Sequence, residues 1–172
     1  TSYRYEQFWI NLPEANWIET GSYFYFNSGG NTNNYYVWFD KNGDGVTDKP
    51  SVSRSEIRVD LSEFNEQQNQ SREALRDSTY LSLTSKISNH FTIQKQDSSQ
   101  IVMTAVAHGE TDNIQNVNVN NLDWSIQEDG GVDNYYNDIY TSTDTKAIWY
   151  PSWGLLLLFL SGILDLVYRD NS

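Results

Sequence analysis

Hydrophobic and polar positions alternate most clearly between Gly21 and Phe39. Aromatic residues dominate two short runs, residues 23–26 and 35–39, and a polar, glycine-containing segment separates them. Two such runs around a turn-forming loop predict a β-hairpin. Because both faces of these strands carry rings, we expect one face to pack on a helix and the other on a further element or another subunit.

The period of the pattern changes after this hairpin. Residues 57–61 alternate cleanly and predict a third strand. Residues 65–89 lack Gly and Pro and carry apolar side chains at helical spacing, which predicts an amphipathic helix that begins at its first residue or closer to Ser71. Residues 91–94 and 101–106 flank a polar segment and predict a second hairpin. The element order ββ(β)αββ indicates an α+β fold, in which a small antiparallel sheet packs on one amphipathic helix.

The ends of the chain show a weaker pattern. We divide the sequence into an N-terminal segment (1–20), an α+β core domain (21–127), and an arm with an apolar C-terminal assembly segment (128–172). Beyond Gly109, Asn, Asp and Gly dominate, and the weak alternation there predicts irregular structure with at most one strand. The arm is rich in tyrosine and acids and has too few apolar residues for a core of its own.

Residues 155–160 form the most apolar run of the chain. In a helix, Ser161, Asp165 and Arg169 would share one line, and the rest of the circumference would be apolar. At about 1.5 Å per residue the apolar stretch 155–168 would be on the order of 20 Å long, whereas a bilayer core needs about 30 Å. We therefore expect a helix that is buried against protein and no stable membrane span.

Charge and composition narrow the classes of partner. The 172 residues include 11 Lys and Arg and 23 Asp and Glu, a formal net charge of −12. Such a surface repels phosphate backbones, so we expect no nucleic-acid partner. Cysteine is absent, which excludes disulfides, thiolate metal sites and a thiol nucleophile. The 15% aromatic content is typical of a folded chain and not of a disordered acidic one.

The loop of residues 40–48 is the best candidate ligand site. Oxygen-bearing residues at positions one, three, five and nine, with Gly at position six, can wrap a hard cation such as calcium. These residues are Asp40, Asn42, Asp44 and Asp48. Position twelve is Ser51, which cannot supply the bidentate carboxylate of an EF-hand. Calcium is the one cofactor that the sequence suggests, and a plain Asp-Gly turn is the alternative explanation of the same residues.

No catalytic set stands out in the sequence. His90 and His108 are the only histidines and lack the spacing of zinc ligands. Carboxylate pairs such as Glu128 and Asp129 are common in so acidic a chain, and a solvated acidic loop explains them better than a glycosidase site. We expect no enzyme, and two alternatives stay open. One is an acidic hydrolase, and the other is a carbohydrate-binding module, because rings beside Asn- and Asp-rich loops suit sugar stacking.

Residues 21–126 resemble a domain common in structural proteins of tailed bacteriophages. The most specific part is Tyr35-Tyr36-Val37-Trp38-Phe39, followed by the Asp-Gly loop. The strand at 57–61, the helix, a Phe-containing strand and a Val-Thr-rich strand follow in the same order, and a Gly-x-Thr-Asp turn ends the series at residues 109–112. The resemblance implies a virion component without a catalytic site, made in the cytoplasm of the host bacterium.

The resemblance therefore predicts a structural protein of the tail, baseplate or fibre-attachment region, with other virion proteins and copies of itself as partners. A capsid-surface decoration protein is an alternative, and a host glycan is a less favoured partner. We expect the tyrosine-rich arm and the terminal segment to form the assembly interface. The predicted contact residues are Tyr135, Tyr136, Tyr140, Trp149, Trp153, Leu156, Leu157, Phe159, Leu160, Ile163, Leu164 and Val167.

Overall fold

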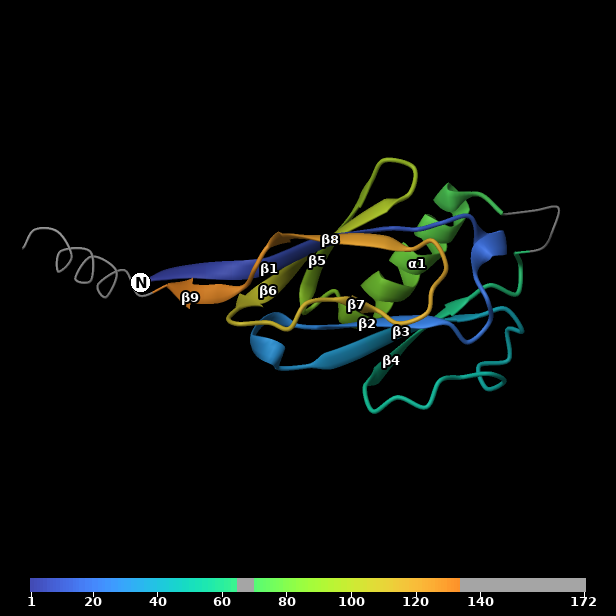
Figure 1. Cartoon of the computed structure of the whole chain (residues 1–172), viewed down its shortest axis with the longest axis horizontal. Coiled ribbons are helices and arrows are strands. Elements are labelled where there is room, and N and C mark those ends of the chain that lie inside the picture. The colour runs from blue at the N-terminus through green and yellow to red at the C-terminus, as the bar shows by residue number, and fades with distance from the viewer. Residues whose placement is uncertain (65–69, 134–172) are drawn as a thin grey trace, which may run out of the picture. The chain divides into compact units, whose positions relative to one another are not determined.

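The computed structural model describes residues 1–64 and 70–133. Within these ranges, nine strands form two sheets, and one α-helix packs with them. The α+β class predicted from the sequence is confirmed, but the single small sheet of that prediction is wrong, because the two predicted hairpins lie in different sheets. Residues Tyr3–Val132 form a compact unit, which is the part of the molecule described below (Figure 1).

The first sheet has the strand order β5-β6-β1-β8, and β9 also pairs with β1. Its strands are β1 (Ser2–Asn11), β5 (Phe91–Gln96), β6 (Gln100–His108), β8 (Asp123–Glu128) and β9 (Gly131–Asp133). The predicted second hairpin is confirmed as the antiparallel pair β5 and β6. Strand β1 lies between β6 and β8, so the segment 1–20, to which the sequence pattern assigns no element, supplies the central strand of this sheet.

The second sheet has the strand order β4-β3-β2-β7. Its strands are β2 (Tyr23–Asn27), β3 (Asn34–Asp40), β4 (Ser55–Asp60) and β7 (Gln115–Asn116). The aromatic hairpin is confirmed as β2 and β3. Strand β4 runs parallel to β3, whereas the predicted sheet is antiparallel. The long connection between the two strands makes this possible, because a parallel pair needs a crossover of about a dozen residues or more.

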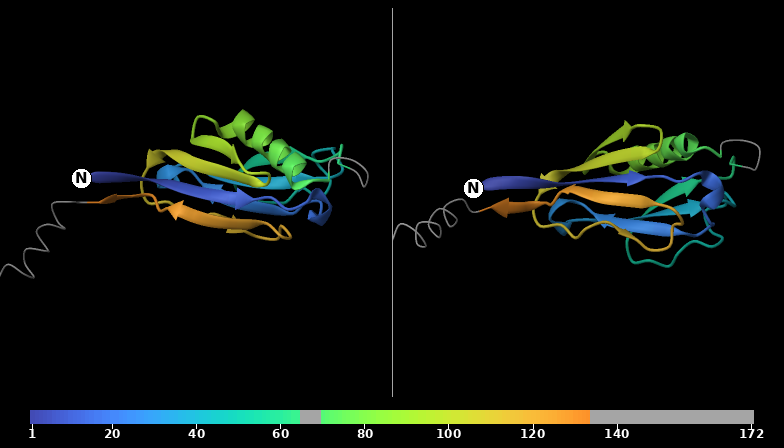
Figure 2. Two further views of the ribbon diagram at one scale, coloured as in Figure 1. Left: turned by 90° about the horizontal axis from the view of Figure 1, so that it is seen from above. Right: turned by 45° about the horizontal axis from the view of Figure 1, so that its top comes forward.

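Helix α1 (Arg72–Ile87) begins later than residue 65, next to Ser71. The Ser71 hydroxyl accepts a hydrogen bond from the Ala74 amide at 3.1 Å and so caps the first turn. The buried residues Leu75, Thr79, Leu83 and Ile87 recur every fourth position. This face packs against β4 and β5, each an edge strand of its own sheet (Figure 2). The helix therefore covers one edge of each sheet, at β4 and at β5.

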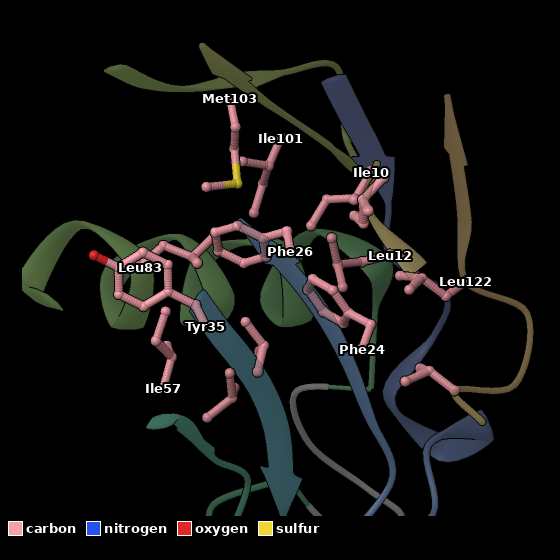
Figure 3. Packing of buried hydrophobic residues seen from close by; sticks show 14 of the residues in the cluster. Ile10, Leu12, Phe24, Phe26, Tyr35, Ile57, Leu83, Ile101, Met103 and Leu122 are labelled. Atoms are coloured by element: carbon pink, nitrogen blue, oxygen red, sulfur yellow. The ribbon is translucent and has the colours of Figure 1, made fainter. Parts of the chain in front are cut away.

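The main core lies between the two sheets and the helix (Figure 3). Phe26 of β2 packs against Phe8 of β1 and Phe91 of β5, with ring centroids 5.6 and 5.4 Å apart. All three rings are almost completely buried. Phe26 thus joins residues from three distant parts of the sequence. Two short 3₁₀ helices, Ala15–Trp17 and Gly29–Asn31, connect the strands around this core.

The outer face of the second sheet is also partly buried. Tyr36 and Trp38 point away from the main core, yet 2% and 0% of their surfaces are exposed. Residues 41–54 cross this face, where Lys49 forms an ion pair with Glu56. The rings on both faces of β3 are therefore covered, as the sequence pattern predicts, and part of the cover on the outer face comes from the chain's own loop.

Candidate functional site

Asp40, the first residue of the predicted calcium loop, is completely buried at the end of β3. Its Oδ1 accepts a hydrogen bond from the Gly43 amide at 2.9 Å, and its Oδ2 accepts one from the Gly45 amide at 2.7 Å. Arg58 of β4 reaches the same Oδ2 with Nε and Nη2, each at 2.8 Å. The carboxylate therefore closes its own loop and pairs with a guanidinium.

These contacts determine the ionisation of Asp40. Burial alone would raise the pKa of this carboxyl, but the hydrogen bonds from Gly45, Arg58 and Gly43 and the charge of Arg58 outweigh burial and hold the pKa below its ordinary value. A cation at Asp40 would have to displace the guanidinium and two amides. Asp40 thus has a structural role that does not depend on a bound ion.

The other residues of the loop follow the geometry of a turn. The Asp44 carboxylate accepts hydrogen bonds from the hydroxyl of Thr47 and from the amides of Val46 and Thr47, which together lower its pKa to about 2. Asn42 and Asp48 are exposed. Across residues 1–64 and 70–133, no cluster of three or more His, Asp or Glu side chains is placed to hold a metal. The described geometry thus agrees with the plain-turn alternative.

A hollow of about 380 Å³ lies on the outer face of the second sheet, and we call it the polar pocket. Its lining residues are Tyr25, Asn27, Arg54, Asp112, Asn113 and Gln115. Gln115 of β7, Tyr25 of β2 and Tyr36 of β3 are register partners and form one row across the sheet. Strand pairing therefore fixes one side of this pocket.

The guanidinium of Arg54 is held by two neighbours. Its Cζ lies 4.0 Å from the centre of the Tyr25 ring, and its Nη1 donates to Asn27 Oδ1 at 2.7 Å. A guanidinium over an aromatic face gains a cation–π interaction and loses rotational freedom. Arg54 is thus already oriented at the polar pocket without a ligand.

Asn31 links the two chain segments that flank the polar pocket. Its Oδ1 accepts hydrogen bonds from Asn27 Nδ2 at 2.7 Å and from the Asp112 amide at 2.9 Å. The neighbouring Thr111 hydroxyl donates to the Gly109 carbonyl and accepts from the Gly30 amide. The Gly-x-Thr-Asp turn is therefore part of the scaffold that positions Asp112.

Sequence reasoning did not identify the polar pocket. The segments that contribute Asn27, Arg54 and Asp112 are far apart along the chain and meet only through the pairing of β2 with β3 and β7 and of β3 with β4. The one available signal was the Gly-x-Thr-Asp turn, which contributes Asp112.

A second hollow of about 390 Å³ is lined by Asn11, Leu12, Arg72, Asn121, Leu122 and Asp123, none of which is aromatic.

Three rings form an exposed group near the start of β1, which we call the aromatic patch. Tyr3 packs against His108 with ring centroids 4.1 Å apart and the ring planes tilted by 30°, and Tyr5 meets the same ring edge-on at 6.0 Å. Tyr3 and Tyr5 are 54% and 41% exposed. The register between β1 and β6 begins at the pair Tyr5 and His108, so Tyr3 lies beyond the end of that ladder.

The two histidines take part in packing and hydrogen bonding. His108 belongs to the aromatic patch, and His90 shares a hydrogen bond of 3.2 Å with the side-chain amide of Asn33 and meets the Tyr35 ring edge-on. These contacts explain both histidines without a metal.

Glu6 is a buried carboxyl that the sequence pattern does not reveal. It lies in the middle of β1 and is 1% exposed. Its Oε2 accepts a hydrogen bond from the Gly130 amide at 2.8 Å, while no partner for Oε1 occurs among the described residues. Burial raises the pKa of Glu6, the Gly130 bond opposes this increase, and the charge of Asp129 adds to it. Glu6 thus links β1 to the turn between β8 and β9.

The twelve residues of the predicted assembly interface lie between positions 135 and 167, outside the described residues. The interface assignment therefore stays a prediction. Among the residues that the structure describes, no helix is long and apolar enough to cross a membrane.

Comparisons with known proteins give no match. No family model matches the chain, and neither the curated proteins nor the solved structures include a significant relative.

Proposed function

We propose that this chain is a structural component of a bacteriophage virion, in the tail, baseplate or fibre-attachment region, and that it acts by protein–protein assembly. The observation that carries the proposal is the aromatic patch, where Tyr3 and Tyr5 are about half exposed at the end of a sheet. The resemblance of residues 21–126 to a phage structural domain supports the same role. The apolar sequence of residues 155–160 adds a second region suited to burial.

The aromatic patch offers a substantial driving force for association. A tyrosine presents roughly 150–250 Å² of surface, so covering the exposed half of one ring removes about 100 Å² from water. At about 25 cal/mol per Å², each ring contributes about 2–3 kcal/mol before the cost of association. Two rings on one face therefore provide the centre of a contact, which the rest of an interface would complete.

The backbone at the start of β1 favours the same use. The ladder with β6 begins at Tyr5, and Tyr3 lies beyond it with an exposed ring. Strand β9 also pairs with β1, so the edge proposed for this contact is the one on the side of β6 beyond Tyr5. A strand from another chain that pairs with this edge would add main-chain hydrogen bonds to the ring contacts. The proposed partner at this position is thus a copy of the chain or another virion protein that supplies a strand or an apolar surface.

Sedimentation velocity of the purified full chain over a range of concentrations tests the proposal. We expect concentration-dependent association, and a marked loss of it in the double variant Tyr3→Ser and Tyr5→Ser. Leu81→Ser is the matched control, because Leu81 is 65% exposed on α1, away from the aromatic patch. A wild-type chain that stays monomeric at every concentration, or equal loss in the control, would contradict assembly through this patch.

A further inference from the structure

The polar pocket presents hydrogen-bonding atoms that have no partner among residues 1–64 and 70–133. Nη1 of Arg54 donates a hydrogen bond to Asn27. In the described part of the chain, no hydrogen bond engages Nε or Nη2 of Arg54. The Asp112 carboxylate and the Gln115 amide likewise make no hydrogen bond or ion pair to described residues, although both line the pocket. Free donors and free acceptors thus surround one hollow.

Charge limits the ligands that this hollow suits. Arg54 and Asp112 carry opposite charges, so the lining as a whole is neutral. The net charge of −12 on the chain disfavours the approach of an anion, and the guanidinium of Arg54 disfavours a cation. An apolar ligand gains little, because the face of Tyr25 near the pocket is already occupied by the guanidinium. A neutral polar ligand fits these constraints best.

Hydroxyl groups match the unused atoms. Arginine is a pure donor and an ionised carboxylate is a pure acceptor, whereas a hydroxyl donates one hydrogen bond and accepts others. One hydroxyl of a ligand can thus donate to Asp112 while its neighbour accepts from Arg54, and the Gln115 amide can serve either kind of group. The volume of about 380 Å³ lies within the range of small-molecule sites.

We propose that the polar pocket binds a neutral saccharide through Arg54, Asp112 and Gln115. Binding requires little rearrangement, because Tyr25 and Asn27 hold the guanidinium and Asn31 holds the Asp112 backbone before any ligand arrives. On a virion this site would recognise glycans of the host surface. Saccharide binding itself does not depend on assembly, since none of its residues belongs to the aromatic patch.

Saturation-transfer difference NMR tests this proposal with the full chain, because the method observes the ligand and tolerates large assemblies. The probes are lactose, maltose, cellobiose and N,N′-diacetylchitobiose. Each is used at about 10 mM, so that even weak binding with a Kd of about 1 mM, which corresponds to only about −4 kcal/mol, is detected. We expect transfer to at least one of these sugars. Asp112→Asn and Gln115→Ala should each weaken binding about tenfold. Neither side chain bonds to a residue that the structure describes, so melting temperatures should stay unchanged.

The control variant is Gln94→Ala, which removes an exposed amide from β5 on the other sheet and should leave transfer intact. Absence of transfer with all four sugars would overturn the proposal. So would equal transfer in wild type, Asp112→Asn and Gln115→Ala, because binding would then lie elsewhere. Galacturonic acid is a further probe, and transfer to it alone would show an anion site in place of a neutral saccharide site.

Discussion

Replacing Arg58 with methionine tests the role of the ion pair under the Asp40 loop. Methionine keeps most of the aliphatic stem of Arg58 but removes the guanidinium. Within the described part of the chain, the Asp40 carboxylate, which has zero exposure, then keeps only two backbone donors, Gly43 and Gly45. Removing one partner of a buried ion pair costs about 3–5 kcal/mol. Because the Arg58 side chain is 30% exposed, we expect a loss near the lower limit, about 3 kcal/mol at neutral pH.

The pH dependence distinguishes this cause from a general packing defect. The lowered pKa of Asp40 means that its contribution is present above the ordinary value of 3.8 and is lost as the pH falls through the lower folded value. In Arg58→Met the same buried carboxyl has no cation, so its pKa rises and protonation relieves the variant in acid. The stability difference between wild type and variant should therefore shrink as the pH falls.

Urea denaturation of the full chain, followed by circular dichroism, measures both effects. The double variant Asp40→Asn with Arg58→Met removes the charge together with its partner and should recover about half of the loss. If Arg58→Met is as stable as wild type at neutral pH, or if the difference does not depend on pH, the ion pair does not stabilise the loop as described.

Three further predictions concern the fold and the loop. Glu6→Gln should raise the free energy of unfolding by about 1–2 kcal/mol at neutral pH in the same urea assay, because it removes a buried charge with one oxygen unpartnered among the described residues. The raised pKa of Glu6 means that the stability contributed by the protonated carboxyl is present below the ordinary value of 4.5 and is lost as the pH rises. A stability gain of the Gln variant that grows in acid would contradict this prediction. Gly29→Ala should destabilise by about 3 kcal/mol or more, since an added Cβ would lie 1.8 Å from the Ala107 carbonyl oxygen; an unchanged urea midpoint would count against this packing. Addition of calcium should leave the melting temperature unchanged, because the Asp40 carboxylate is already paired, and a rise that EDTA reverses would show a bound ion after all.

Local periodicity predicted the elements whose hydrophobic positions keep one phase. The aromatic hairpin, the strand before the helix, the helix and the second hairpin all carry an uninterrupted pattern, and all are present. Beyond Gly109 the prediction of at most one strand is wrong, because the weak alternation there conceals three short strands, β7, β8 and β9.

Strand β1 was missed because the hydrophobic phase of its sequence changes. Tyr3 and Tyr5 occupy odd positions, Phe8 and Ile10 occupy even ones, and the buried Glu6 interrupts the apolar series. The strand itself does not change face, because Glu6, Phe8 and Ile10 all lie buried on one side and Tyr3 and Tyr5 lie exposed on the other.

Local patterns also do not determine which strands share a sheet. The pairing of β1 with β6 and β8, and the parallel pairing of β4 with β3, join segments far apart in the sequence. The polar pocket depends on the same long-range pairing. Arg54 has no distinctive neighbours in the sequence, and its position over Tyr25 follows only once β4 pairs with β3 and β3 pairs with β2. The structural role of the buried Asp40 carboxylate likewise depends on its contact with Arg58, which the sequence pattern does not predict.

Quantitative mass spectrometry of purified phage particles tests the central claim most directly. Particles are separated from a lysate in which the gene is expressed, and the copy number of this chain is compared with that of the major capsid protein. We predict a fixed ratio that survives repeated gradient purification. A chain that is abundant in the lysate but absent from the particles would contradict a structural role in the virion.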